Sequence, residues 1–100
     1  MFVHAVYFWL KPDLNEAGQA QFWAGVRSLG TIKSVKHCFI GTPAATDRSI
    51  IDRSYSCALT IVFAGDAEQE AYQIDPIHDA FRDGCAHLWE RVLIYDSITG

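Results

Sequence analysis

The sequence is poor in the features that would point to a membrane or a nucleic acid. Its longest unbroken apolar run, Ala5 to Leu10, is far shorter than the ~20 residues of a membrane-spanning helix. No basic stretch precedes an apolar one at the N-terminus. The 8 Lys and Arg are outnumbered by 12 Asp and Glu and form no cluster that would attract phosphates or anionic lipids. We therefore expect an unprocessed, soluble chain without a membrane or nucleic-acid partner.

Cysteine is scarce as well, and its spacing excludes the common cysteine-based sites. Cys38, Cys57 and Cys85 are odd in number and form no CxxC pair, so they encode neither a disulfide framework nor a zinc site. We expect them to be small buried hydrophobes in a reduced, cytoplasmic protein. The motifs GxGxxG, GxxxxGK, GxSxG and HExxH are also absent. We accordingly expect no cofactor and no metal site.

What the chain does have is enough apolar material for one core. Half of its 100 residues are hydrophobic, and no linker, repeat or low-complexity tract divides them. A chain of this length folds as one domain. The sequence therefore predicts a single domain over residues 1–100.

Four segments show the alternation of side chains that is typical of strands. Each one alternates two sets of residues with a period of two and is rich in β-branched and aromatic side chains. The loop at 44–54 is polar and predicted to lie at the surface. The predicted strands are Phe2–Leu10, Val35–Ile40, Tyr55–Phe63 and Val92–Tyr95.

A long helix is predicted between the first two strands. Asp13 with Glu16 three residues later is a possible capping box, and the apolar stripe continues to about Leu29. Gly30 is the expected stop of this helix.

Two shorter helices are predicted after the third strand. Asp66 with Gln69 indicates a capping box for a helix through Tyr72. Asp75 as N-cap and Pro76 in the first turn then open a second helix. Gly84 weakens the continuation of that helix.

The order of these elements predicts an α+β fold of the ferredoxin-like split βαβ type. It is a four-stranded antiparallel sheet with the helices on one face. The other face would be too apolar to leave in water, so we predict a homodimer that joins two sheets into a dimeric α+β barrel. The residues expected on that face are Val3, Ala5, Tyr7, Trp9, Ile40, Ala58, Val62, Leu93 and Tyr95.

The candidate site lies between the sheet and the helices. Tyr72 and His78 flank the predicted turn at 74–76, so both can face one apolar space, and His4 reaches it from the first strand. An apolar cleft with a few converging polar groups is the usual form of a small-molecule site. The expected lining consists of His4, Val6, Phe8, Phe22, Trp23, Val26, Leu59, Ile61, Phe81, Trp89, Val92 and Ile94.

His78 is the candidate base. A histidine in the first turn of a helix is kept neutral by the helix dipole, whereas Asp75 and Asp79 favour the protonated ring. The sequence leaves the direction of the pKa shift open. A histidine on an apolar face also has a purely structural interpretation, as a satisfied core residue.

Several segments together resemble the stress-responsive α/β-barrel (Dabb) family over nearly the whole chain. The most specific is a Tyr…Pro-x-His-x-x-Phe string, here Tyr72, Pro76, His78 and Phe81. Others are His4 to Phe8 at the start, Gly41, the strand at 55–63, and Tyr95 with Asp96 near the end. The family commonly has a histidine just before the proline, where this chain has Asp75.

The resemblance implies a dimer and a range of functions. Most members have no assigned reaction, and a branch comprises polyketide cyclases that act without a cofactor. In that branch a histidine matching His78 acts as the base and a tyrosine matching Tyr72 orients or polarises a carbonyl. The leading hypothesis is thus a homodimer with a pocket for a small apolar or carbonyl-containing ligand. The alternatives are a cofactor-free cyclase, lyase or isomerase, a monooxygenase-like protein, and a purely structural stress protein.

Overall fold

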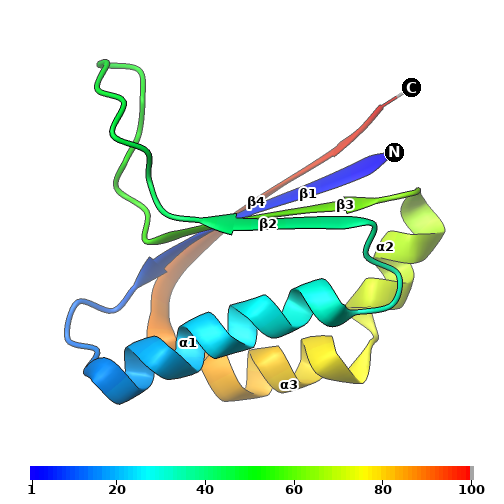
Figure 1. The fold of residues 1–100 in the computed structure, drawn as a ribbon, viewed down its shortest axis with the longest axis horizontal. Coiled ribbons are helices and arrows are strands. Elements are labelled where there is room, and N and C mark those ends of the chain that lie inside the picture. Colours follow the sequence, from blue (N-terminus) through cyan, green and yellow to red (C-terminus); the bar gives the residue numbers. More distant parts are fainter. Residues whose placement is uncertain (100) are drawn as a thin grey trace.

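The chain folds into one antiparallel sheet with the strand order β2-β3-β1-β4 and the helices on one of its faces (Figure 1). The computed structural model describes residues 1–99. β1 and β2 run in the same direction with β3 inserted antiparallel between them, which is the split βαβ arrangement that the sequence predicts. The elements are β1 (Phe2–Leu10), α1 (Glu16–Ser28), η1 (Leu29–Thr31), β2 (His37–Gly41), β3 (Cys57–Phe63), α2 (Asp66–Gln73), α3 (Pro76–Cys85), η2 (Ala86–Leu88) and β4 (Trp89–Ile98).

The strand register determines which side chains share a face. Val6 of β1 lies opposite Leu59 of β3 and Ile94 of β4. His4 lies opposite Ile61 and Asp96 in the same way. Because side chains alternate between faces, the even-numbered residues of β1 all point toward the helices.

The core lies between this face of the sheet and the helices. Burial of these side chains, at roughly 25 cal/mol for each Å² of apolar surface, is the main stabilising contribution to the fold. The thiols fit the sequence prediction, because Cys57 and Cys85 are buried, Cys38 is half-buried and all three are free. The buried apolar residues are Val6, Phe8, Phe22, Val26, Leu29, Ile32, Cys57, Leu59, Ile61, Phe63, Tyr72, Phe81, Cys85 and Leu88.

The opposite face of the sheet carries no helix in the described chain and is largely apolar (Figure 1). The sequence prediction for β2 was wrong about which of its side chains face the helices. Ile40 pairs with Leu59 and packs against the core, whereas Phe39 pairs with Thr60 on the open face and is 61% exposed. Tyr95 on β4 is likewise 61% exposed. We call this surface, formed by the odd-numbered residues of β1 and their neighbours in register, the open face.

Two of the predicted helix boundaries need correction. α1 is capped by Asn15, whose side chain accepts a hydrogen bond from the Gly18 N–H at 2.8 Å, and Asp13 has no part in this cap. Gly30 is not the left-handed stop that the sequence predicts. It lies inside η1, which directly follows α1.

At the later helices the outcome is mixed. α2 begins at Asp66, with Gly65 as N-cap and no side-chain cap. Asp75 caps α3 as predicted, since its carboxylate accepts from the Ile77 N–H at 2.8 Å and Pro76 follows in the first turn. α3 also runs through Gly84 to Cys85. None of the helices in residues 1–99 is long and apolar enough to cross a membrane.

Two helical glycines should respond to alanine in opposite directions. A Cβ on Gly25 would lie 2.6 Å from Cys85 Sγ and 3.1 Å from Phe81 Cδ1, where α1 packs on α3. Gly25→Ala should therefore lose about 1–3 kcal/mol of unfolding free energy through overpacking. Gly84 has open space at the same point, so Gly84→Ala should gain about 0.4–1 kcal/mol by restricting the unfolded chain.

Urea unfolding measures both changes in unfolding free energy, provided that the dependence of this free energy on urea concentration is the same for all variants. Adding Cys85→Ala to Gly25→Ala should recover part of the loss, because it removes the atom that clashes. Equal effects of the two glycine substitutions would contradict this account of the α1–α3 contact.

Candidate functional site

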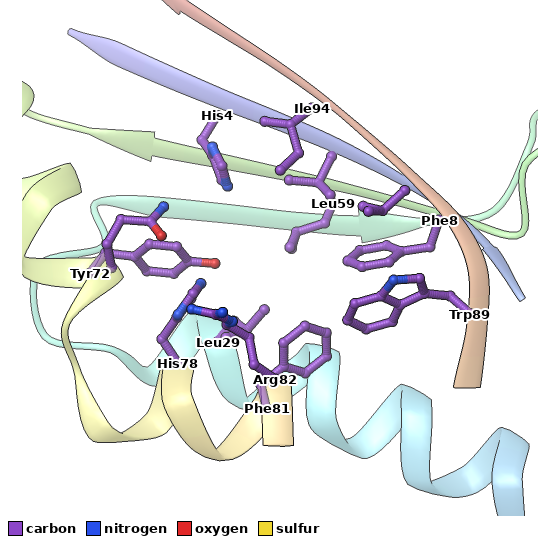
Figure 2. A pocket seen from close by; sticks show the side chains of 13 residues that line it. His4, Phe8, Leu29, Leu59, Tyr72, His78, Phe81, Arg82, Trp89 and Ile94 are labelled. Atoms are coloured by element: carbon purple, nitrogen blue, oxygen red, sulfur yellow. The ribbon is translucent and has the colours of Figure 1, made fainter. Parts of the chain in front are cut away.

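A cavity of about 270 Å³ lies between the helix-covered face of the sheet and the helices (Figure 2). Strands β1, β3 and β4 form one wall, and α2, α3, η1 and the start of β4 form the rest. Most of the lining side chains are aliphatic or aromatic. The lining residues are His4, Val6, Phe8, Leu29, Leu59, Tyr72, Gln73, His78, Phe81, Arg82, Trp89, Val92 and Ile94.

Most of the residues predicted to line a pocket meet at this cavity, and four of them lie elsewhere. Phe22, Val26 and Ile61 are fully buried in the core behind its wall. Trp23 is half-buried on α1, where its indole N–H donates to Gln19 Oε1 at 3.4 Å. These four side chains therefore support the cavity or its surroundings without lining it.

Sequence reasoning missed three lining residues, Leu29, Gln73 and Arg82. Gln73 directly follows Tyr72 at the end of α2. Arg82 follows His78 by four residues on α3, and this spacing places two side chains on the same helix face. That spacing was the available signal for Arg82.

The cavity opens along β4, the edge strand next to β1. Val92 and Ile94 lie opposite Phe8 and Val6 of the core, yet they are 39% and 50% exposed. A residue that faces the core and still contacts solvent marks the rim of a cavity. β4 therefore forms one side of the mouth, and the exposed Arg82 of α3 is also at the rim.

Tyr72 is the most enclosed polar residue of the cavity. It comes from the last turn of α2, is 1% exposed, and contacts the rings of Phe63, His4 and His78 edge to face. Its hydroxyl points into the cavity (Figure 2), and no hydrogen bond to it is present among residues 1–99. Burial raises the pKa of this hydroxyl well above its ordinary value, so it stays protonated and can donate.

His78 lies beside Tyr72, with ring centroids 4.8 Å apart. It is the third residue of α3, so the Asp75 cap and the first turn of that helix fix its position. Within residues 1–99, its Nδ1 is buried and has no hydrogen-bond partner. An unsatisfied buried polar group costs roughly 1–3 kcal/mol, which is the kind of cost that a ligand can offset.

The charge state of His78, which the sequence leaves open, is decided by its surroundings. Partial burial lowers its pKa below the ordinary value, and the positive charge of Arg82 and the ring of His4 act in the same direction. The carboxylates of Asp79 and Asp75 oppose this shift. The net direction is downward, so the imidazole is neutral at pH 7 and can accept a proton.

His4 adds a third ring on the sheet side of the cavity. Its Nδ1 lies 2.5 Å from Asp96 Oδ1, which projects from the directly opposite position on β4. His4 is 5% exposed and its ring centroid is 5.7 Å from that of Tyr72. The carboxylate fixes the orientation of the imidazole, and the rest of the ring faces the cavity (Figure 2).

The arrangement combines apolar walls, a hydroxyl donor and a neutral imidazole. These are the groups that can hold a carbonyl compound and move a proton next to its carbonyl carbon. No group of three or more metal-ligating side chains comes together in the part of the chain that the structure describes.

Comparison with known proteins agrees with this fold. Several of the solved structures that resemble it are described as ferredoxin-like. A Dabb family protein with a ferredoxin-like fold from Mesorhizobium loti is 26% identical with a TM-score of 0.77, over 98% of this chain and 95% of that one. A dimeric ferredoxin-like protein of unknown function from Thermobifida fusca is 18% identical with a TM-score of 0.77, over 98% and 90%.

Hydroxynitrile lyase from Passiflora edulis is 20% identical with a TM-score of 0.79, over 99% of this chain and 93% of that one. The sequence model of the stress-responsive A/B barrel domain, Dabb, matches residues 2–99. The chain therefore belongs to the Dabb family, as its sequence motifs indicate. No curated protein matches it.

The lowered pKa of His78 should be visible as a titration and as a pH-dependent stability. Between its folded pKa and about 6.5, the unfolded chain binds a proton that the folded chain does not. The unfolding free energy should therefore fall as the pH falls through this window. His78→Gln should remove this part of the pH dependence.

NMR titration of the His78 ring protons gives the folded pKa directly, and urea unfolding at several pH values gives the stability. A His78 pKa above that of a histidine model peptide would contradict the structural argument.

Proposed function

We propose that the protein is a homodimer that binds a small, largely apolar, carbonyl-containing molecule in one cavity per subunit. The observation that carries the proposal is the buried, unpartnered Nδ1 of His78 beside the inward-pointing Tyr72 hydroxyl. The walls of the cavity are otherwise mostly apolar. Such a lining supports an apolar ligand whose position is set by one polar group.

A reaction of the lyase, cyclase or isomerase type without a cofactor is the second proposal for the same site. His78 would take a proton from the carbon next to the carbonyl, and the electron pair of that C–H bond would form the enolate. Tyr72 would donate a hydrogen bond to the enolate oxygen, and His78 would return the proton to carbon or to a leaving group. That a hydroxynitrile lyase shares this fold supports a lyase-type reaction in such a scaffold.

A purely structural role is less well supported. It predicts a filled core in which Tyr72 and His78 bond to each other or to the backbone. The cavity of about 270 Å³ and the absence of such bonds among residues 1–99 argue for a ligand instead.

The open face supports the dimer. It presents exposed aromatic residues, including Phe39 and Tyr95, and apolar patches of this kind mark interaction surfaces. The loop between β2 and β3 projects on the side away from the helices, where it could contact a second copy (Figure 1). Similar structures of this fold are described as dimeric. The free thiols further support a reducing location such as the cytoplasm.

A charge on the open face should dissociate the dimer. Tyr95→Asp places an unpaired carboxylate where two sheets would pack about 10 Å apart, so it should shift the protein to monomers. Ala24→Asp, on the exposed side of α1, is the control and should leave the oligomer unchanged. Native mass spectrometry and sedimentation at micromolar concentration report the mass. A wild-type monomer would refute the homodimer.

The ligand and the chemistry can be tested together with 2-octanone in D₂O. Wild-type protein should show shifts at the Tyr72 and His78 resonances and should speed exchange of the protons next to the carbonyl. His78→Gln should reduce this exchange by about 10²–10⁴-fold, the usual contribution of a positioned acid–base group. His87→Gln, which alters an exposed histidine outside the cavity, is the matched control.

The two proposals have separate outcomes in this experiment. Shifts without faster exchange would refute the reaction and keep the binding site. The absence of shifts at Tyr72 and His78 would count against binding of this class of ligand.

A further inference from the structure

Arg82 is unusual among the residues that line the cavity. The chain carries a net charge of −4, yet in the described structure Arg82 is the only cavity residue with a permanent charge. The other polar groups of the lining are the histidines His4 and His78, the Tyr72 hydroxyl and the Gln73 amide. The cavity of this acidic protein therefore presents one arginine charge, with the carboxylates of Asp75 and Asp79 near His78 and that of Asp96 bound to His4.

The position of Arg82 directs its charge toward the candidate site. It lies one helical turn after His78 on α3, and Figure 2 shows the two side chains together at the helix side of the cavity. Its charge is close enough to His78 to lower the pKa of that ring.

No carboxylate or other acceptor in the described chain pairs with the Arg82 guanidinium. Among residues 1–99, Arg82 makes no ion pair within 4.0 Å and no side-chain hydrogen bond. Asp79 and Asp75 are the carboxylates near His78, and neither pairs with Arg82. A guanidinium has five N–H donors in a planar fork that fits a carboxylate. Arg82 is exposed, so it offers an unpaired anion-binding group at the rim of the apolar cavity.

We propose that the ligand is an amphipathic carboxylate whose carboxyl group pairs with Arg82 while its apolar body fills the cavity toward Phe8 and Trp89. This inference rests on the proposed function and specifies its ligand class. A keto group on the same molecule would be held near Tyr72 and His78.

A carboxylate fits better than a phosphate for reasons of charge. One guanidinium balances the single charge of a carboxylate, and bidentate pairing fixes its orientation. A phosphate monoester carries nearly two charges at pH 7. The described lining offers no second permanent cation for it.

A carboxylate bound to Arg82 would also change the pKa of His78, the candidate base. Arg82 is one of the groups that lower the pKa of His78, and a bound carboxylate neutralises its charge. The pKa of His78 should therefore rise when the ligand binds. A carboxylate ligand would make His78 a stronger base only while the site is filled.

Octanoate and octanamide test this inference, because they share an apolar chain and differ in charge. Calorimetry with the wild-type protein should give roughly two- to tenfold tighter binding of octanoate, since hydrogen bonds to charged groups are stronger than neutral ones and solvent weakens an ion pair at the rim. Arg82→Gln should remove the difference, and Arg82→Lys should restore part of it. Arg27→Gln, an exposed arginine on α1 outside the cavity, is the control and should keep the full preference. In NMR titrations, octanoate but not octanamide should raise the His78 pKa.

The outcomes distinguish this inference from the proposed function. Equal affinities for octanoate and octanamide in the wild type would overturn the role of Arg82 and leave the apolar pocket intact. A preference for octanoate that survives Arg82→Gln would overturn it as well. The failure of octanoate, octanamide and 2-octanone to bind would overturn both the inference and the proposed ligand site.

Discussion

The arrangement of the site depends on the alternation of side chains along β1 and on the register of its two neighbours. β1 is a central strand, antiparallel to β3 on one side and to β4 on the other. Its even-numbered residues face the helices, so His4 meets Asp96 across the sheet and Val6 meets Ile94. A shift of one residue would move all of them to the open face. Such a shift would break the packing of Phe8 against the rings of Phe22, Phe81 and Trp89, so it is very unfavourable.

The second constraint is the short connection between α2 and α3. Tyr72 ends one helix and His78 begins the next, and the Asp75 cap with Pro76 fixes the turn between them. The two rings thereby meet at 4.8 Å. The site retains an unsatisfied buried nitrogen, a cost of roughly 1–3 kcal/mol that the tightly buried core around Phe22, Leu59 and Phe63 can offset. Local violations of this kind are typical of functional sites.

The fold leaves two apolar surfaces, and their shapes suit different partners. The open face spans the sheet and presents aromatic side chains such as Tyr7, Trp9 and Tyr95, which suits the sheet of a second copy. The cavity is concave, narrow and edged by Val92 and Ile94, which suits a small molecule. Arg82 adds a permanent charge to the cavity, whereas Arg91 on the open face lies over the ring of Trp9.

Although the strand bounds differ from the predicted ones, most of all for β4 at Trp89–Ile98, the sequence by itself determined the number and order of the strands, the fold class, the Asp75 cap and the shared space of Tyr72 and His78. These depend on periodicity of two, on capping chemistry and on short separation along the chain, which are local properties. Only the tertiary structure decided the cap at Asn15, the face on which Ile40 and Phe39 lie, and the membership of the cavity. Asp13 and Asn15 can both cap a helix, and a short strand such as β2 has two faces of similar polarity.

The burial of each side chain could not be predicted from the sequence either, because it depends on how the helices pack on the sheet. The rotation of α1 and α3 against the sheet places Phe22 and Val26 behind the cavity wall and brings Arg82 to it. The direction of the His78 pKa shift follows from that packing, because burial and the charge of Arg82 together outweigh Asp75 and Asp79. Local patterns specified the elements of the site, and the distances between residues far apart in the chain specified its chemistry.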